Sequence, residues 1–159
     1  MILGMSLQTF TLFHVLISLI GIASGFVAVY GFFTSKRLDG WNAVFLVTTA
    51  LTSLTGFLFP FNGFTPGFKI GVLSMVALAL ATVARYPMHL AWRKTYVITS
   101  CVALYFNVFV LIVQLFEKVP ALRALAPTKS EPPFAIAQGV CLVVFIVLTI
   151  FSVKKFRVI

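Results

Sequence analysis

Five of the polar side chains within the long apolar stretches of the chain are candidate ligand contacts, because a polar group there is costly unless it is bonded. They are His14, Thr52, Asn107, Gln114 and Gln138. Imidazole, hydroxyl and carboxamide groups all donate and accept hydrogen bonds. Gathered around a cavity, they would bind a small hydrophobic or weakly polar ligand such as a lipid or a quinone. The alternative is a hydrogen-bond network between helices, with about 0.6 kcal/mol in each bond.

Residues that commonly perform catalysis are scarce. The only acidic residues are Asp39, Glu117 and Glu131, and all three lie at the ends of apolar runs or between them. We therefore expect no carboxylate proton relay across a membrane and no intramembrane catalytic triad or carboxylate pair. No cluster has the spacing of metal ligands, and there is no glycine-rich phosphate loop. The sequence predicts a protein that is not an enzyme and has neither a metal site nor a cofactor.

Haem is the one alternative cofactor, because the chain has two histidines, His14 and His89. His14 lies near the start of the first apolar run and His89 just after the third. The topology given below predicts that they lie near opposite faces of the membrane, so one haem cannot be held by both within one chain. A single-histidine site, or a site shared between two chains, stays open as an alternative.

The composition excludes a water-soluble domain and a disordered chain. Of the residues, 61% are apolar and 9% charged, and the mean hydropathy is +1.11. Soluble domains carry about 25% charged residues. The net charge of +9 would suggest nucleic acid as a partner of a soluble protein. Here the basic residues flank apolar runs, as in membrane proteins, so we expect membrane lipids as partners and no nucleic acid.

Five apolar runs are close to the roughly 20 residues that a helix needs to cross a bilayer. They lack the alternation of barrel strands, and only helices or closed barrels satisfy the backbone in lipid. The sequence therefore predicts an all-α, polytopic transmembrane helical bundle that forms one domain over residues 1–159. The predicted spans are 9–33, 41–61, 68–86, 95–116 and 133–153.

The distribution of basic residues predicts that the N-terminus is outside and the C-terminus inside. With that orientation the inner side carries eight basic residues and the outer side four, as the positive-inside rule requires. The inner set is Lys36, Arg37, Arg85, Arg93, Lys94, Lys154, Lys155 and Arg157, and the outer set is Lys69, Lys118, Arg123 and Lys129. In this topology the five polar candidates concentrate in the outer half of the membrane.

Local motifs refine the picture of packing and loops. Gly21 and Gly25 form a GxxxG motif, which favours close helix packing. Cys101 and Cys141 lie within apolar runs and are expected to be small buried residues without a disulfide. The stretch 120–126 predicts a short interfacial helix that begins with proline. Ser130 is expected to cap the last helix.

Three stretches carry a resemblance: Leu51–Phe61, Asn107–Gln114 and Leu125–Phe134. Together with His14 and the turn 64–66, they make most of the chain similar to a group of small bacterial integral membrane proteins with no established activity. The resemblance implies a bacterial inner-membrane location. It implies no ligand and no functional residue.

The preferred functional hypothesis is an accessory or scaffold protein that packs with itself as a homo-oligomer or with a larger membrane complex. It rests on small-residue packing faces without catalytic groups. The alternative is binding or transport of a small hydrophobic or weakly polar ligand in an outer-half cavity.

Overall fold

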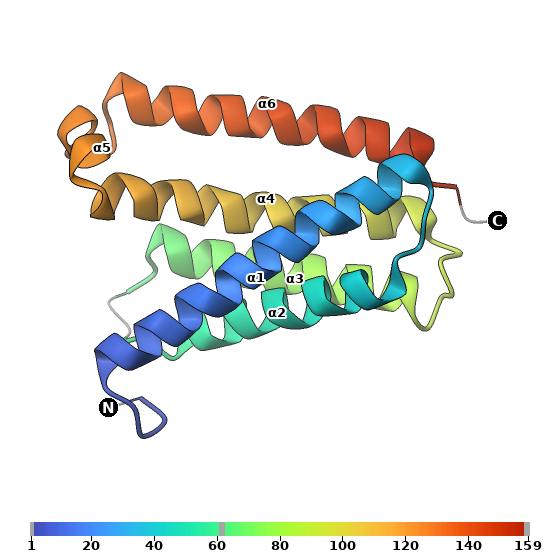
Figure 1. Cartoon of the computed structure of the whole chain (residues 1–159), viewed down its shortest axis with the longest axis horizontal. Coiled ribbons are helices and arrows are strands. Elements are labelled where there is room, and N and C mark those ends of the chain that lie inside the picture. The colour runs from blue at the N-terminus through green and yellow to red at the C-terminus, as the bar shows by residue number, and fades with distance from the viewer. Residues whose placement is uncertain (1, 61–62, 158–159) are drawn as a thin grey trace.

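The computed structural model describes residues 2–60 and 63–157, apart from the side chain of Pro66, and this part of the chain is helical (Figure 1). The prediction of an all-α bundle is confirmed for these residues. The helices are α1 (Leu7–Thr34), α2 (Asp39–Phe57), α3 (Pro66–Arg85), α4 (Arg93–Lys118), α5 (Pro120–Leu125) and α6 (Pro132–Lys155). The short helix α5 lies where the sequence predicted an interfacial helix.

The five long helices lie along one another, and the two ends of the chain lie at opposite ends of the bundle (Figure 1). One end holds the α1–α2 turn, the α3–α4 turn and the C-terminal residues, and we call it the basic end. The other holds the N-terminus, the segment between α2 and α3, and α5, and we call it the α5 end. All eight residues of the predicted inner set fall in segments at the basic end.

The second helix ends earlier than the sequence predicted. It was expected to reach residue 61, but α2 ends at Phe57, and residue 61 lies outside the described residues. A proline at position 60 disfavours helical geometry at the residue before it. The chain therefore leaves the helix through a turn at Leu58, whose N–H bonds the carbonyl of Thr55 at 3.1 Å.

The N-cap of α6 is Glu131 and not the predicted Ser130, and the helix begins at Pro132. The Glu131 carboxylate accepts hydrogen bonds from the Thr128 hydroxyl (2.8 Å) and from the backbone N–H of Ser130 (3.1 Å). The Thr128 hydroxyl is the main cause that holds the pKa of Glu131 below its ordinary value. Glu131 thus organises the turn that precedes α6.

Among the described residues, four helices are long and apolar enough to cross a membrane, as in a multi-pass membrane protein: α1, α3 from residue 67, α4 and α6. Apolar side chains cover much of the surface of the long helices. The core between the helices is small and includes Phe32, Phe45, Tyr96, Leu104 and Phe145. Cys101 and Cys141 are buried and free, as expected.

Helix α1 crosses the bundle obliquely, and its glycines make the crossing possible (Figure 1). A Cβ at Gly25 would lie 2.6 Å from Leu104 of α4 and 3.0 Å from Phe45 of α2. A Cβ at Gly21 would lie 3.2 Å from the Thr48 hydroxyl of α2. The predicted GxxxG motif is therefore the contact point of α1 with two helices at once.

Helix α2 contains five Ser and Thr residues and Asn42. Its polar side chains point into the bundle: Asn42, Thr49, Ser53 and Thr55 are all buried. Its outer face is apolar, with exposed side chains at Trp41, Val44, Val47, Leu51 and Leu54. This pattern is the reverse of a helix on a water-soluble protein, where the polar face is outermost.

Candidate functional site

The most prominent polar site is built around a buried arginine at the basic end. Arg85 is the last residue of α3, and its side chain is only 1% exposed. Its guanidinium donates a hydrogen bond to the Tyr96 hydroxyl (2.9 Å) and another to the Arg37 carbonyl (3.3 Å). It also forms an ion pair with Asp39. We call Asp39, Asn42, Arg85 and Tyr96 the Arg85 cluster.

The cluster continues from Tyr96 to Asn42. The Tyr96 hydroxyl donates to the Asn42 side-chain oxygen. The Asn42 amide donates to the carbonyls of Arg37 (2.8 Å) and Leu38 (3.0 Å) at the start of α2. The guanidinium carbon of Arg85 also lies 5.1 Å from the centre of the Tyr96 ring, within range of a cation–π interaction.

These contacts connect α2, α3 and α4 at one point and compensate a charge that is removed from water. Burying a cation costs several kcal/mol unless charge and hydrogen bonds replace its hydration. The Asp39 side chain is 68% exposed, so the negative partner stays hydrated while the positive one is enclosed. The arrangement holds helix ends together, and it presents no nucleophile next to a base.

This cluster was not predicted from the sequence. Arg85 was counted only as one of the inner-side basic residues, and Asp39 only as an acidic residue at the end of an apolar run or between two runs. One signal was available: Arg85 lies inside the predicted span 68–86, not after it. An arginine within a span must either extend to the interface or find a buried partner, and its partner lies 46 residues away in the chain.

The predicted candidates form contacts in separate places rather than one cluster. The His14 imidazole Nδ1 lies 2.7 Å from the Thr55 hydroxyl of α2. The edge of its ring meets Phe59, with 5.2 Å between ring centres. The Asn107 amide lies 3.4 Å from the Thr49 hydroxyl, again between two helices. Both contacts are of the kind that a hydrogen-bond network between helices requires.

The remaining three candidates differ from one another. Gln138 of α6 donates to the Phe109 carbonyl of α4 (3.2 Å), while its side-chain oxygen is buried without a partner among the described residues. The Thr52 hydroxyl bonds the Thr48 carbonyl of its own helix (2.8 Å). Gln114 is exposed. Within the described residues, no hydrogen bond joins two of the five candidates.

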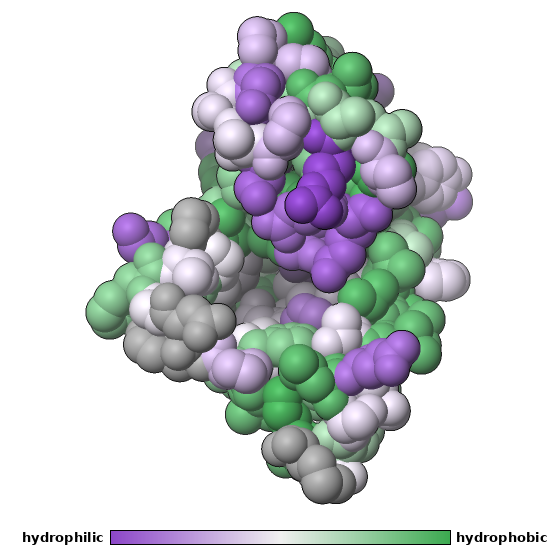
Figure 2. All heavy atoms as spheres, turned by 90° about the vertical axis from the view of Figure 1, so that its left-hand side faces the viewer, coloured by the Kyte–Doolittle hydropathy of each residue, from purple (hydrophilic) through white to green (hydrophobic). Residues whose placement is uncertain are grey.

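The α5 end is hollowed. Figure 2 shows a depression on this face, with a group of hydrophilic side chains above it and mainly apolar side chains below. The loop that carries α5 contributes charged groups at this end, including the ion pair between Lys129 and Glu117 at 2.6 Å.

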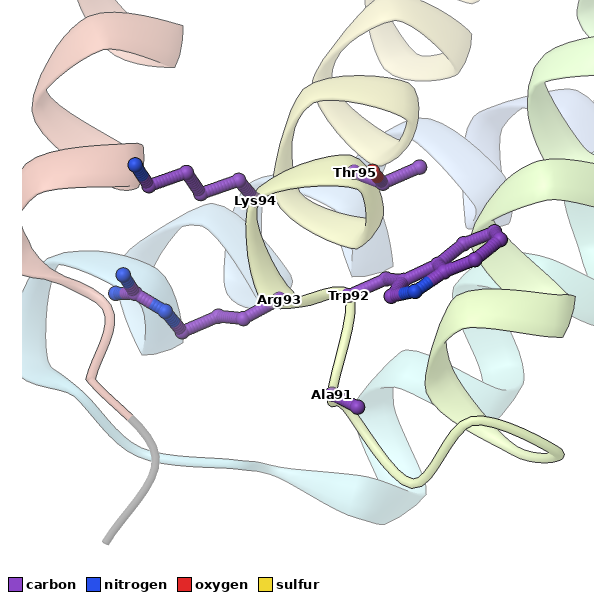
Figure 3. Close-up of a pocket in the computed structure, with 5 residues that line it drawn as sticks. All are labelled: Ala91, Trp92, Arg93, Lys94 and Thr95. Carbon is purple, nitrogen blue, oxygen red and sulfur yellow. The ribbon is translucent and has the colours of Figure 1, made fainter.

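A second concave region lies at the basic end, where α4 begins. It is a pocket of about 430 Å³ lined by the consecutive residues Ala91, Trp92, Arg93, Lys94 and Thr95 (Figure 3). The side chains of Arg93 and Lys94 extend toward the end of α6, and Trp92 points to the other side, toward α3. Arg93 is engaged there: it donates to the carbonyls of Val153 and Phe156.

Within residues 2–60 and 63–157, no three His, Cys, Asp or Glu side chains come together as metal ligands. Comparison of the whole chain with models of protein families, with curated proteins and with solved structures finds no match.

Proposed function

We propose that the protein is a five-span protein of the bacterial inner membrane, with the N-terminus outside and the C-terminus in the cytoplasm. Helix α2 is the fifth span in this proposal. Its outward apolar face and inward polar face suit lipid outside and protein inside. The excess of basic residues at one end supports the orientation. The resemblance noted in the sequence supports the bacterial location.

Within that membrane, the proposed role is that of an accessory or scaffold protein that packs with itself or with a larger membrane complex. The observation that carries this role is the outward face of α6. Only 11% of the most apolar part of α6 is buried, against 28–33% for the other three candidate spans. Helix α6 is thus the most peripheral of the four candidate spans and has the most surface left for a partner.

The exposed side chains on this side of α6 form one continuous row. The α6 outer face consists of Ile136, Val140, Val143, Val144, Val147 and Phe151, each 44–64% exposed. Steps of four, three and four residues from Ile136 to Val147 keep them on one side of the helix, with the spacing of paired helices. β-Branched side chains lose little rotamer freedom on packing, which favours van der Waals association in lipid.

Cysteine crosslinking combined with native mass spectrometry tests the proposed association. Val143→Cys is placed on the α6 outer face in a chain whose Cys101 and Cys141 are changed to Ser. Val76→Cys, at a 55% exposed site on α3, is the matched control. We expect an oxidised dimer or a crosslinked partner protein with Val143→Cys and none with the control. A chain that leaves mild detergent only as a monomer, with no co-purified protein, would contradict the proposal.

A second candidate function is binding or transport of a small hydrophobic or weakly polar ligand at the α5 end. Two observations favour it: the depression on that face (Figure 2) and the buried, unpaired side-chain oxygen of Gln138. Protein purified from its own host and extracted with organic solvent should then release one small molecule in stoichiometric amount. An extract containing only bulk membrane lipid would count against this function.

A further inference from the structure

A narrow apolar groove lies between α4 and α6. Its volume is about 260 Å³, and its lining includes Cys101 and Tyr105 from α4 and Ile146, Thr149 and Ile150 from α6. None of the residues that line it is charged. It adjoins the α6 outer face on the side toward α4, because Ile146 and Ile150 follow Val143 by three and seven residues and line the groove together with residues of α4.

Positive charge marks the end of the groove that lies nearest the basic end. Lys94 precedes Cys101 by seven residues, which places it on the same face of α4 about 10 Å further along the axis. Lys154 follows Ile150 by one helical turn on α6. Figure 3 shows the Lys94 side chain extending toward α6. The groove thus runs from an uncharged apolar region to two lysines.

Lys94 is available for a ligand, whereas its neighbour is not. Arg93 is occupied by the carbonyls at the end of α6. Lys94 is exposed and has no ion pair or hydrogen bond among the described residues.

We propose that this groove binds one anionic phospholipid, with its phosphate at Lys94 and Lys154 and an acyl chain along the groove. The proposal rests on the membrane placement proposed above. The order of charge and apolar surface matches a phospholipid, whose phosphate lies at the membrane surface and whose chain lies below it. A second copy of the chain seated in this groove, related by an axis along the membrane normal, would bring the same lysines together, and that like-charge contact is unfavourable.

Native mass spectrometry of the full chain in mild detergent tests the proposal. The probes are dioleoyl phosphatidylglycerol and dioleoyl phosphatidylcholine, added at equal concentration, and the lipid is counted on the monomer. We expect one phosphatidylglycerol molecule to be retained in preference to phosphatidylcholine. Lys94→Gln should lower its affinity about five-fold, the equivalent of about 1 kcal/mol per basic residue. The control Lys69→Gln removes the same charge at the α5 end and should have no effect.

A second pair of variants separates a lipid from other occupants. Ile146→Trp fills the groove and should abolish retention of phosphatidylglycerol, whereas Val143→Trp adds the same bulk to the α6 outer face and should not. If Ile146→Trp leaves retention unchanged while inorganic phosphate competes with the lipid, the lysines bind only phosphate and the proposal is overturned. Loss of a dimer with Ile146→Trp would show instead that two copies meet at the groove.

Equal retention of the two lipids, or equal effects of Lys94→Gln and Lys69→Gln, would also overturn the proposal. If circular dichroism shows that Ile146→Trp loses helix, the retention of phosphatidylglycerol by Lys94→Gln is the deciding measurement, because Lys94→Gln changes only an exposed side chain. Because lipid is counted on the monomer, the result does not depend on whether the protein associates with any other protein.

Discussion

The ion pair between Asp39 and Arg85 should contribute more to stability than the neighbouring pair on the surface. Removing one partner of a buried pair costs about 3–5 kcal/mol, and water around the 68% exposed Asp39 reduces this. We therefore expect Asp39→Asn to lower the free energy of unfolding by about 2 kcal/mol, because the guanidinium stays enclosed without its counter-charge. In the background of Arg85→Met, where no charge is buried, Asp39→Asn should leave the free energy of unfolding almost unchanged.

The assay is unfolding of the purified protein by sodium dodecyl sulfate in mixed micelles, followed by circular dichroism. The four members of the cycle give a coupling energy, expected at about 2 kcal/mol. Arg37→Gln is the matched control, since Arg37 also faces Asp39, at 3.5 Å, but is 56% exposed. It should cost less than about 1 kcal/mol. If Asp39→Asn costs the same with and without Arg85, the ion pair does not stabilise the fold and the reasoning is refuted.

Three further predictions use the same unfolding assay or NMR. His14→Ala should lower stability by about 1 kcal/mol if its bond to α2 belongs to a network between helices, and unchanged or raised stability would favour the ligand hypothesis. Gly25→Ala should lower stability by about 1–3 kcal/mol, because its Cβ would lie 2.6 Å from a leucine methyl of α4. The control Gly139→Ala, with open space around its Cβ, should be neutral or stabilising. The lowered pKa of Glu131 means that its stabilising effect is present above the ordinary carboxyl pKa and is lost as the pH falls through the lowered value. An NMR titration should show the pKa of Glu131 rising in Thr128→Val, and an unchanged value would contradict the assigned cause.

The helices could be predicted because their signals are local. Runs of apolar residues long enough to cross a bilayer are closed by basic residues, proline or glycine, and these signals need no partner elsewhere in the chain. The ends were less predictable. Helix α2 stops at Phe57 although apolar residues continue, because Pro60 acts on the backbone and not on hydropathy.

The sequence could predict that certain polar side chains need hydrogen-bond partners, but not which residues those partners are. The sequence shows that His14 and Asn107 require a bond, but not that Thr55 and Thr49 provide it. The Arg85 cluster was beyond the sequence analysis for the same reason. Its members are separated by up to 57 residues in the chain, from Asp39 to Tyr96, and only the packing of three helices brings them together.

The contact between the α1–α2 turn and the residues that follow α6 has a consequence for the synthesis of the chain. The Ser35 hydroxyl donates to the Arg157 carbonyl (2.5 Å) and accepts from its N–H (2.9 Å), and the Phe32 and Phe156 rings lie 5.1 Å apart. A ribosome reaches Arg157 only after it has translated α1 to α6, so the contact of Ser35 with Arg157 forms after these helices have been synthesised. A chain that stops before Phe156 would lack one of the two rings, Tyr96 and Phe156, that pack against Phe32.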